Sequence, residues 1–164
     1  MKELQNISQK LLQEKKVEFI IGYAKGTLPL CSTPIVITND KECGNLIFDL
    51  TCGNNLATYL VKHRKPITDN CKPIGVVAKG CDGRSIVQYI VEGQIKRENV
   101  VIIGVPCKGV VDFKKVREKI GEREILDYRI AGDKILLEGK DLHISLSTQE
   151  ILDDGCLFCK YPKV

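Results

Sequence analysis

Cysteine is the residue type in this sequence with the most evident chemistry. The chain has eight cysteines among 164 residues. In the reducing compartment that we expect for it, thiols bind metals or do redox chemistry more often than they build a disulfide framework. Two of them form a Cys-x-x-Cys pair, whose thiolates can ligate one metal ion or one face of a cluster. The eight are Cys31, Cys43, Cys52, Cys71, Cys81, Cys107, Cys156 and Cys159.

Two strands in the middle of the chain predict where two solitary cysteines lie. Residues 73–79 and 99–105 are short, nearly continuous apolar runs, typical of strands covered on both faces, and a helix is expected between them over about 84–92. A strand, helix, strand unit of this size is a parallel, right-handed crossover. Cys81 and Cys107 each follow one of these strands, so we expect them on neighbouring strand ends.

Cys52 is expected at the same edge of the sheet, because it follows a third strand-like run over 46–50. Sites in open parallel sheets form where the carboxyl ends of the strands meet. Cys81, Cys107 and the pair Cys156 and Cys159 would supply four thiolates from three loops, which suits a 4Fe-4S cluster. N–H groups in turns over 80–83 and 104–109, and at the helix N-terminus after Cys81, would hydrogen-bond the cluster sulfurs.

The residues alone leave three interpretations of the cysteines open. A 4Fe-4S cluster is favoured over structural zinc, because zinc sites usually bring two close cysteine pairs and this chain has one. A thiol-redox pair is the third interpretation. It ranks last, because a thioredoxin-type motif is expected early in a helix after a strand, whereas Cys156 and Cys159 lie just before Pro162.

The pattern of apolar residues predicts an α/β fold for a single domain over 1–164: a mainly parallel sheet with crossover helices, followed by a C-terminal β-meander. A helix over about 4–13 opens the chain, and the run 34–38 should be an edge strand, because Pro34 cannot donate to a ladder interior. A charged helix is expected over 112–119. The three parts are a parallel βα part (1–120), a β-meander with two hairpin turns (121–150) and a Cys-x-x-Cys tail (151–164).

Composition excludes several partners. The net charge of +4 is modest, basic and acidic residues are interleaved, and tryptophan is absent. The chain therefore lacks the basic and aromatic footprint of a nucleic-acid binder. No apolar stretch approaches the ~18 residues of a membrane span, so we expect no direct membrane insertion. The first sixteen residues lack a signal-peptide core, which predicts a cytoplasmic protein.

Three motifs resemble a known family. They are Gly80-Cys-Asp-Gly-Arg-Ser85, Val105-Pro-Cys107 and Cys156-Leu-Phe-Cys-Lys-Tyr-Pro162. Together they are similar to the beta subunits of hydrogenases and dehydrogenases that use coenzyme F-420. More narrowly, they resemble the branch found in anaerobes beside heterodisulfide-reductase-like and formate dehydrogenase complexes. The resemblance covers about Tyr23 to the end of the chain. It implies one 4Fe-4S cluster ligated by Cys81, Cys107, Cys156 and Cys159.

The family resemblance also implies a flavin, FAD, near the glycine-bearing turn that holds Cys52, Gly53 and Asn54. Cys52 is then a nearby thiol or a substitute ligand. Larger family members continue beyond the Cys-x-x-Cys pair, where they carry further flavin contacts. The resemblance therefore implies an electron relay in this chain, or half of a flavin site that another subunit completes.

The expected role is a subunit of a cytoplasmic oxidoreductase complex rather than a stand-alone enzyme. Its cluster would relay electrons to or from a flavoprotein, hydrogenase, formate dehydrogenase or heterodisulfide-reductase-like partner, and a homo-oligomer is also compatible with the sequence. Two alternatives stay open: a flavin-dependent oxidoreductase subunit and a zinc-stabilised assembly scaffold.

Basic side chains flank the cysteines. Lys79, Arg84 and Lys108 either balance a negative cluster, or hold a phosphate at a helix N-terminus, or are solvated surface charges. The remaining cysteines and histidines are expected to be structural, because free cysteines are commonly buried and lone histidines lack a partner motif. These residues are Cys31, Cys43, Cys71, His63 and His143.

Overall fold

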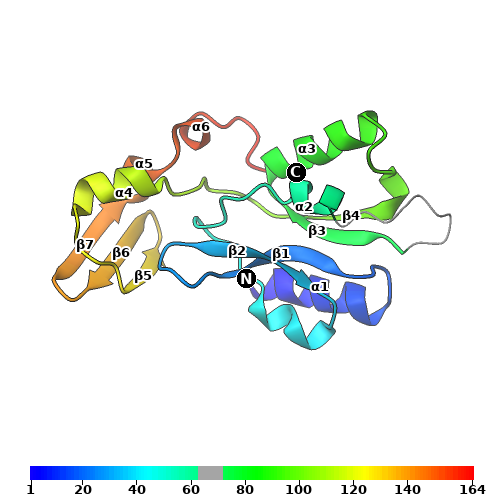
Figure 1. The fold of residues 1–164 in the computed structure, drawn as a ribbon, viewed down its shortest axis with the longest axis horizontal. Coiled ribbons are helices and arrows are strands. Elements are labelled where there is room, and N and C mark those ends of the chain that lie inside the picture. The colour runs from blue at the N-terminus through cyan, green and yellow to red at the C-terminus, as the bar shows by residue number, and fades with distance from the viewer. Residues whose placement is uncertain (63–71) are drawn as a thin grey trace.

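The structure is a computed structural model that describes residues 1–62 and 72–164 (Figure 1). Two β-sheets organise it, a four-stranded sheet in the order β2-β1-β3-β4 and a three-stranded sheet in the order β5-β6-β7. The strands are β1 (Ile20–Lys25), β2 (Ser32–Ile37), β3 (Ile74–Ala78), β4 (Val100–Gly104), β5 (Asp127–Ala131), β6 (Lys134–Gly139) and β7 (Leu142–Ser147). The helices are α1 (Lys2–Gln13), α2 (Ala57–Lys62), α3 (Gly80–Val91), α4 (Phe113–Ile120), α5 (Thr148–Ile151) and α6 (Asp154–Leu157), with 3-10 turns η1 (Asp40–Asn45) and η2 (Arg97–Asn99).

The four-stranded sheet is mostly parallel, as the sequence predicted. β1 pairs with β3 and β3 with β4 in parallel, whereas β2 pairs with β1 in the antiparallel direction. All five residues of β3 are buried, because α3 and α1 lie on opposite sides of this sheet (Figure 1). The edge position of β2, which contains Pro34, confirms that prediction.

The prediction of a strand over 46–50 was wrong. Only one isolated bridge forms there, between Ile47 and Tyr23. Leu46 belongs to the hydrophobic core of the parallel sheet and Leu50 to a second core around the β-meander. The segment therefore crosses from one core to the other and cannot run along a single sheet edge.

Helix α3 begins four residues earlier than predicted, so the expected turn over 80–83 is its first turn. Lys79 is the N-cap, and the Asp82 carboxylate accepts a hydrogen bond from the Lys79 backbone N–H at 3.2 Å. The apolar residues of α3 are not all buried. Ile86 is fully buried, but Val87 and Val91 are exposed by 57% and 75%.

The β-meander is confirmed, since β5, β6 and β7 pair in antiparallel succession. Helix α4 also forms where expected, with Asp112 as its cap and Gly121 at its end. Its buried residues Val116 and Ile120 share a core with the meander rather than with the parallel sheet. Within the described ranges, no helix is both long and apolar enough to cross a bilayer.

Candidate metal centre

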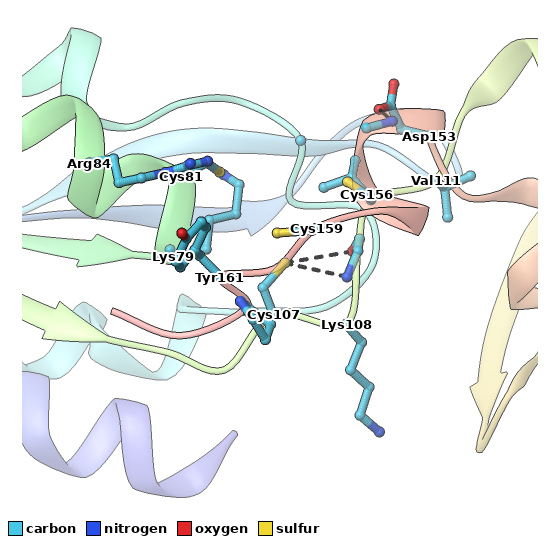
Figure 2. A pocket seen from close by; sticks show the side chains of 16 residues that line it. Lys79, Cys81, Arg84, Cys107, Lys108, Val111, Asp153, Cys156, Cys159 and Tyr161 are labelled. Atoms are coloured by element: carbon cyan, nitrogen blue, oxygen red, sulfur yellow. Dashed lines mark hydrogen bonds between the residues drawn. The ribbon is translucent and has the colours of Figure 1, made fainter.

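Four of the predicted site cysteines line one cavity of about 540 Å³ (Figure 2). Cys81 and Cys107 come from the parallel sheet, and Cys156 and Cys159 come from the tail that follows the meander. We call this cavity the cysteine pocket. Two distant parts of the chain thus supply two thiols each to the same space.

Strand register explains why Cys81 and Cys107 lie close together. Ala78 and Gly104 are the last paired residues of β3 and β4, and the Val105 N–H donates to the Ala78 carbonyl at 3.0 Å. The two strands therefore end side by side. Cys81 follows in the first turn of α3 and Cys107 in the loop after β4.

Backbone hydrogen bonds hold the tail against this edge. The Asp153 N–H donates to the Val110 carbonyl at 2.8 Å, and the Cys107 N–H donates to the Pro162 carbonyl at 2.8 Å. These two bonds bracket the Cys-x-x-Cys pair. Both of its thiols are consequently held opposite the strand ends.

Gly109 shapes the wall between the two halves of the pocket. Its N–H donates to the Cys107 sulfur at 3.4 Å, the kind of contact that stabilises a thiolate or a cluster. Its φ of +105° suits glycine, and a Cβ there would lie 3.3 Å from the Cys156 Cβ and closer still to Leu152. Glycine is therefore needed for the close approach of the tail.

Two of the pocket thiols, those of Cys81 and Cys107, are weaker acids than an ordinary thiol. Burial raises the pKa of Cys81 and of Cys107 above the ordinary thiol value, and the Lys79 ammonium opposes that rise at both. At Cys81 the ammonium has a larger effect on the pKa than the Asp82 carboxylate, which acts in the other direction. Metal ligation by these thiols would release protons.

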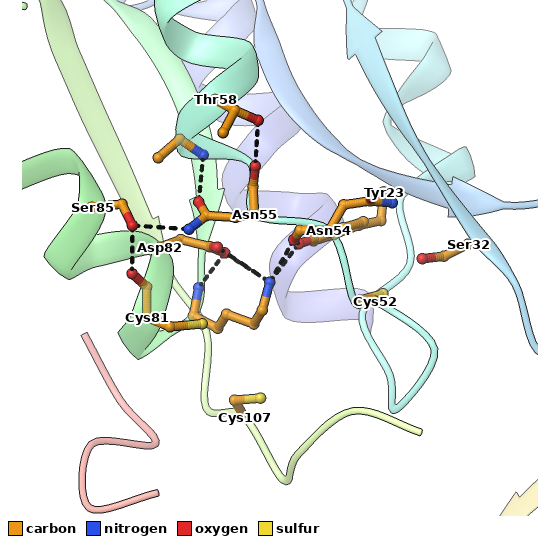
Figure 3. Close-up of polar contacts among 12 residues, drawn as sticks. Tyr23, Ser32, Cys52, Asn54, Asn55, Thr58, Cys81, Asp82, Ser85 and Cys107 are labelled. Atoms are coloured by element: carbon orange, nitrogen blue, oxygen red, sulfur yellow. Dashed lines mark hydrogen bonds and ion pairs between the residues drawn. The ribbon is translucent and has the colours of Figure 1, made fainter. Parts of the chain in front are cut away.

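Lys79 is a buried cation that lines the pocket (Figure 2), and Figure 3 shows its partners Tyr23, Asn54 and Asp82. Only 3% of its surface is exposed, and its Nζ donates to the Tyr23 hydroxyl and the Asn54 carbonyl, both at 2.7 Å. It also forms an ion pair with fully buried Asp82 at 3.1 Å. These partners use its three N–H groups, so Lys79 has none left for a phosphate.

Arg84 and Lys108 line the rim of the pocket. The Arg84 guanidinium lies over the Tyr161 ring, 5.2 Å from its centroid. Lys108 also lines a second cavity of about 250 Å³, which lies beside Phe48 and Ile130. Three of the lining residues are thus cationic, although the Lys108 side chain extends away from the thiols (Figure 2). Asp153 adds a carboxylate to the lining, and Asp82 is paired with Lys79.

Only part of the turn that holds Cys52, Gly53 and Asn54 lies at the cysteine pocket. Gly53 lines the cysteine pocket, whereas the Asn54 carbonyl binds Lys79. Cys52 is 1% exposed and lies in the core, where its sulfur accepts a hydrogen bond from the Asp49 N–H at 3.4 Å. It does not line the pocket.

Burial raises the pKa of the Cys52 thiol to about 11. We expect iodoacetamide at pH 8 to alkylate exposed Cys159 in the native apo protein and to spare Cys52, because reagents attack the thiolate. Peptide mass spectrometry after a timed reaction measures both. Equal modification of the two, with the fold intact by circular dichroism, would contradict this placement of Cys52.

The other predicted residues lie elsewhere. Cys43 is buried, as expected, but Cys31 is half-buried and His143 is exposed on β7. His63 and Cys71 lie outside the described residues. Sequence reasoning missed Tyr23, whereas Gly109 lies in the predicted turn over 104–109 whose N–H groups were expected to donate to sulfur. Nothing near Tyr23 indicated that its hydroxyl meets Lys79.

The pocket fits an iron–sulfur cluster in its donor set, its charge and its size. It offers four thiols, an N–H donor to one sulfur and cationic lining residues, which are what a thiolate-ligated cluster uses. A cavity of about 540 Å³ is also far larger than a single ion needs. Among the described residues, however, no group of three or more histidine, cysteine or acidic side chains could hold a metal ion as the side chains stand.

The fold and the pocket define an α/β protein with four thiols gathered at the carboxyl end of a parallel strand pair. No family model matches the chain. It is 24% identical over 152 residues to the F-420-dependent formate dehydrogenase 1 subunit beta of Methanococcus maripaludis. It is 26% identical over 153 residues to the F-420-dependent formate dehydrogenase subunit beta of Methanocaldococcus jannaschii.

Both similarities cover 88% of this chain but only 38% and 39% of the relatives, so the chain spans well under half of their length. Its fold is similar to a chain of the F-420-reducing NiFe hydrogenase complex from Methanosarcina barkeri. The TM-score is 0.67 at 13% identity, over 96% of this chain and 58% of that one. The chain is thus similar to beta subunits of F-420-dependent formate dehydrogenases in sequence and to a chain of an F-420-reducing hydrogenase complex in fold, which supports the resemblance that its motifs predicted.

Proposed function

We propose that this chain is an electron-transfer component of an oxidoreductase complex, with one 4Fe-4S cluster in the cysteine pocket. The observation that carries the proposal is the convergence of Cys81, Cys107, Cys156 and Cys159 on one cavity. Such a cluster, when bound, accepts and releases one electron at a time. The named relatives are beta subunits of F-420-dependent formate dehydrogenases, which supports redox partners of the hydrogenase, dehydrogenase or flavoprotein class.

The chain's own residues have separable roles in this proposal. The four thiolates would ligate iron, and the Gly109 N–H would stabilise the Cys107 sulfur through its hydrogen bond. The Lys79 ammonium and the rim cations would offset the negative charge of the ligated cluster. Cys159 and Cys81 are exposed, so the pocket lies near enough to the surface for electron exchange with a docked partner.

Anaerobic reconstitution tests the proposal. The apo protein is incubated with ferrous iron, sulfide and a thiol reductant, with an equimolar amount of zinc offered as competitor. We expect about four iron and four sulfide per chain, as a cubane requires, together with broad visible absorbance. A colourless product that holds zinc and no sulfide would instead establish the zinc-stabilised scaffold.

A flavin version of the function has one supporting observation, the second cavity that shares Lys108 with the cysteine pocket. Its volume of about 250 Å³ is small for FAD, since pockets for much smaller ligands run from about 300 Å³ upward. A flavin there would need surface from a partner subunit. Flavin that co-purifies with the isolated chain would contradict this need for a partner.

A further inference from the structure

The last described residues of the tail lie across the start of α3. We call residues 160–164 the clasp segment. Its Pro162 carbonyl accepts the hydrogen bond from the Cys107 N–H at 2.8 Å. The Val164 side chain lies against Gly83 and Gly104, since Cβ atoms at those glycines would be 3.0 and 3.3 Å from it.

Gly80 lies directly under the clasp backbone. A Cβ at this position would overlap the Tyr161 carbonyl oxygen and would lie 3.0 Å from the Lys163 carbonyl oxygen. Both neighbours are backbone atoms, so no side-chain rotation could relieve the clash. Any side chain at position 80 must therefore displace the clasp segment or the helix.

One face of the first turns of α3 receives the whole segment. Gly80, Gly83 and Arg84 are spaced i, i+3 and i+4, which places them on the same face of the helix. Arg84 contacts the Tyr161 ring, and the two glycines meet its backbone and Val164. Glycine disfavours helix relative to alanine. Two glycines at the start of one helix therefore cost stability. The docked clasp segment explains their presence, because it leaves no room for side chains there.

We propose that Gly80 and Gly83 are positioning residues for the cysteine pocket. Their missing side chains let the clasp segment dock on α3, and that docking holds Cys156 and Cys159 opposite Cys81 and Cys107. The inference rests on the proposed function only for the identity of the group that the pocket holds. The docking itself is a property of the apo protein.

Hydrogen exchange at the Cys107 amide tests the docking directly, because that N–H donates to the clasp. We expect Gly80→Ala in the apo chain to speed exchange at this amide by at least about tenfold, since its Cβ overlaps a backbone oxygen and opens the segment locally. Gly83→Ala should speed it by less, because the exposed Val164 side chain can move partly aside. Alanine favours helix over glycine, so a purely structural effect at position 83 would leave this amide protected.

A compensating substitution at Val164 distinguishes the effects of the two glycine variants. Adding Val164→Ala to Gly83→Ala removes the atoms that clash and should restore slow exchange. The same change cannot rescue Gly80→Ala, whose clash is with backbone oxygen. Gly44→Ala is the matched control, because nothing lies within 4 Å of its added Cβ.

Unchanged exchange at the Cys107 amide in folded Gly80→Ala would overturn the inference, and so would faster exchange in Gly83→Ala that Val164→Ala fails to slow. The iron content of the same variants after reconstitution is a separate readout, expected to fall in Gly83→Ala and to recover in the double variant. If no variant and no wild-type chain binds iron, the proposed function fails, while the exchange data still decide the docking.

Discussion

Cys107→Ala should leave a folded protein that retains at most about a tenth of the wild-type iron and sulfide after anaerobic reconstitution and desalting, since even changes outside the ligand shell cost about 10–100-fold in metal affinity. Alanine is preferred to serine, because a serine oxygen could still ligate iron. Cys107 is only half-buried, so the free energy of unfolding of the apo protein should change by less than about 1 kcal/mol.

Cys31→Ala is the matched control for this experiment. Cys31 is also half-buried, but it does not line the cysteine pocket. Its replacement should leave iron content and visible absorbance unchanged. If Cys107→Ala kept full iron and sulfide, or if Cys31→Ala lost them equally, the assignment of the four pocket thiols as ligands would be wrong.

Lys79→Met should lower the free energy of unfolding of the apo protein by about 3–5 kcal/mol, because it leaves the fully buried Asp82 carboxylate without its cation. The Tyr23 hydroxyl and the Asn54 carbonyl lose a hydrogen-bond donor in the same step. Urea denaturation at neutral pH, followed by circular dichroism, measures the change.

Two further variants isolate the buried charge. Adding Asp82→Leu to Lys79→Met removes the stranded carboxylate and should recover much of the lost stability. The pair Lys115–Asp154 lies 2.5 Å apart, but Asp154 is 82% exposed, so Lys115→Met should cost less than about 1 kcal/mol. If Lys79→Met and Lys115→Met lowered the free energy of unfolding equally, the buried ion pair would stabilise the protein no more than the exposed one.

The pH dependence gives the sign of the Lys79 effect. Burial raises the pKa of Asp82 above its unfolded value of 3.8. A group with a raised folded pKa contributes most to stability below its unfolded pKa, and that contribution is lost as pH rises through the folded value. Loss of Lys79 raises the folded pKa of Asp82 further. The deficit of Lys79→Met should therefore be largest near neutral pH and should shrink toward pH 4.

The fold could be predicted where local chemistry decides it. The buried runs around β3 and β4 allow only a covered strand, and the hairpin turns of the meander follow from their glycine and aspartate residues. The run over 46–50 could not be assigned, because its apolar residues serve two different cores and no local pattern records which one. The start of α3 was missed for a related reason: the glycines at 80 and 83 suggest a turn, but the packed tail selects them.

The sequence predicted which cysteines form the candidate site, but it predicted less well how the fold brings them together. Cys81 and Cys107 follow neighbouring parallel strands, so strand order alone brings them together. Cys156 and Cys159 lie close to these two residues only because the tail docks there, which no spacing rule predicts. Their assignment to the same site rested on the family resemblance. The partnership of Lys79 with Tyr23 joins residues far apart in the sequence and needed coordinates.

The division of the cysteine pocket between two parts of the chain has a consequence for biosynthesis. On the ribosome, β3, α3 and β4 emerge and can fold well before Cys156 and Cys159 leave the exit tunnel. The nascent chain thus carries two unmatched thiols for an interval. Ligation by all four thiols can therefore begin only after the Cys-x-x-Cys pair has emerged.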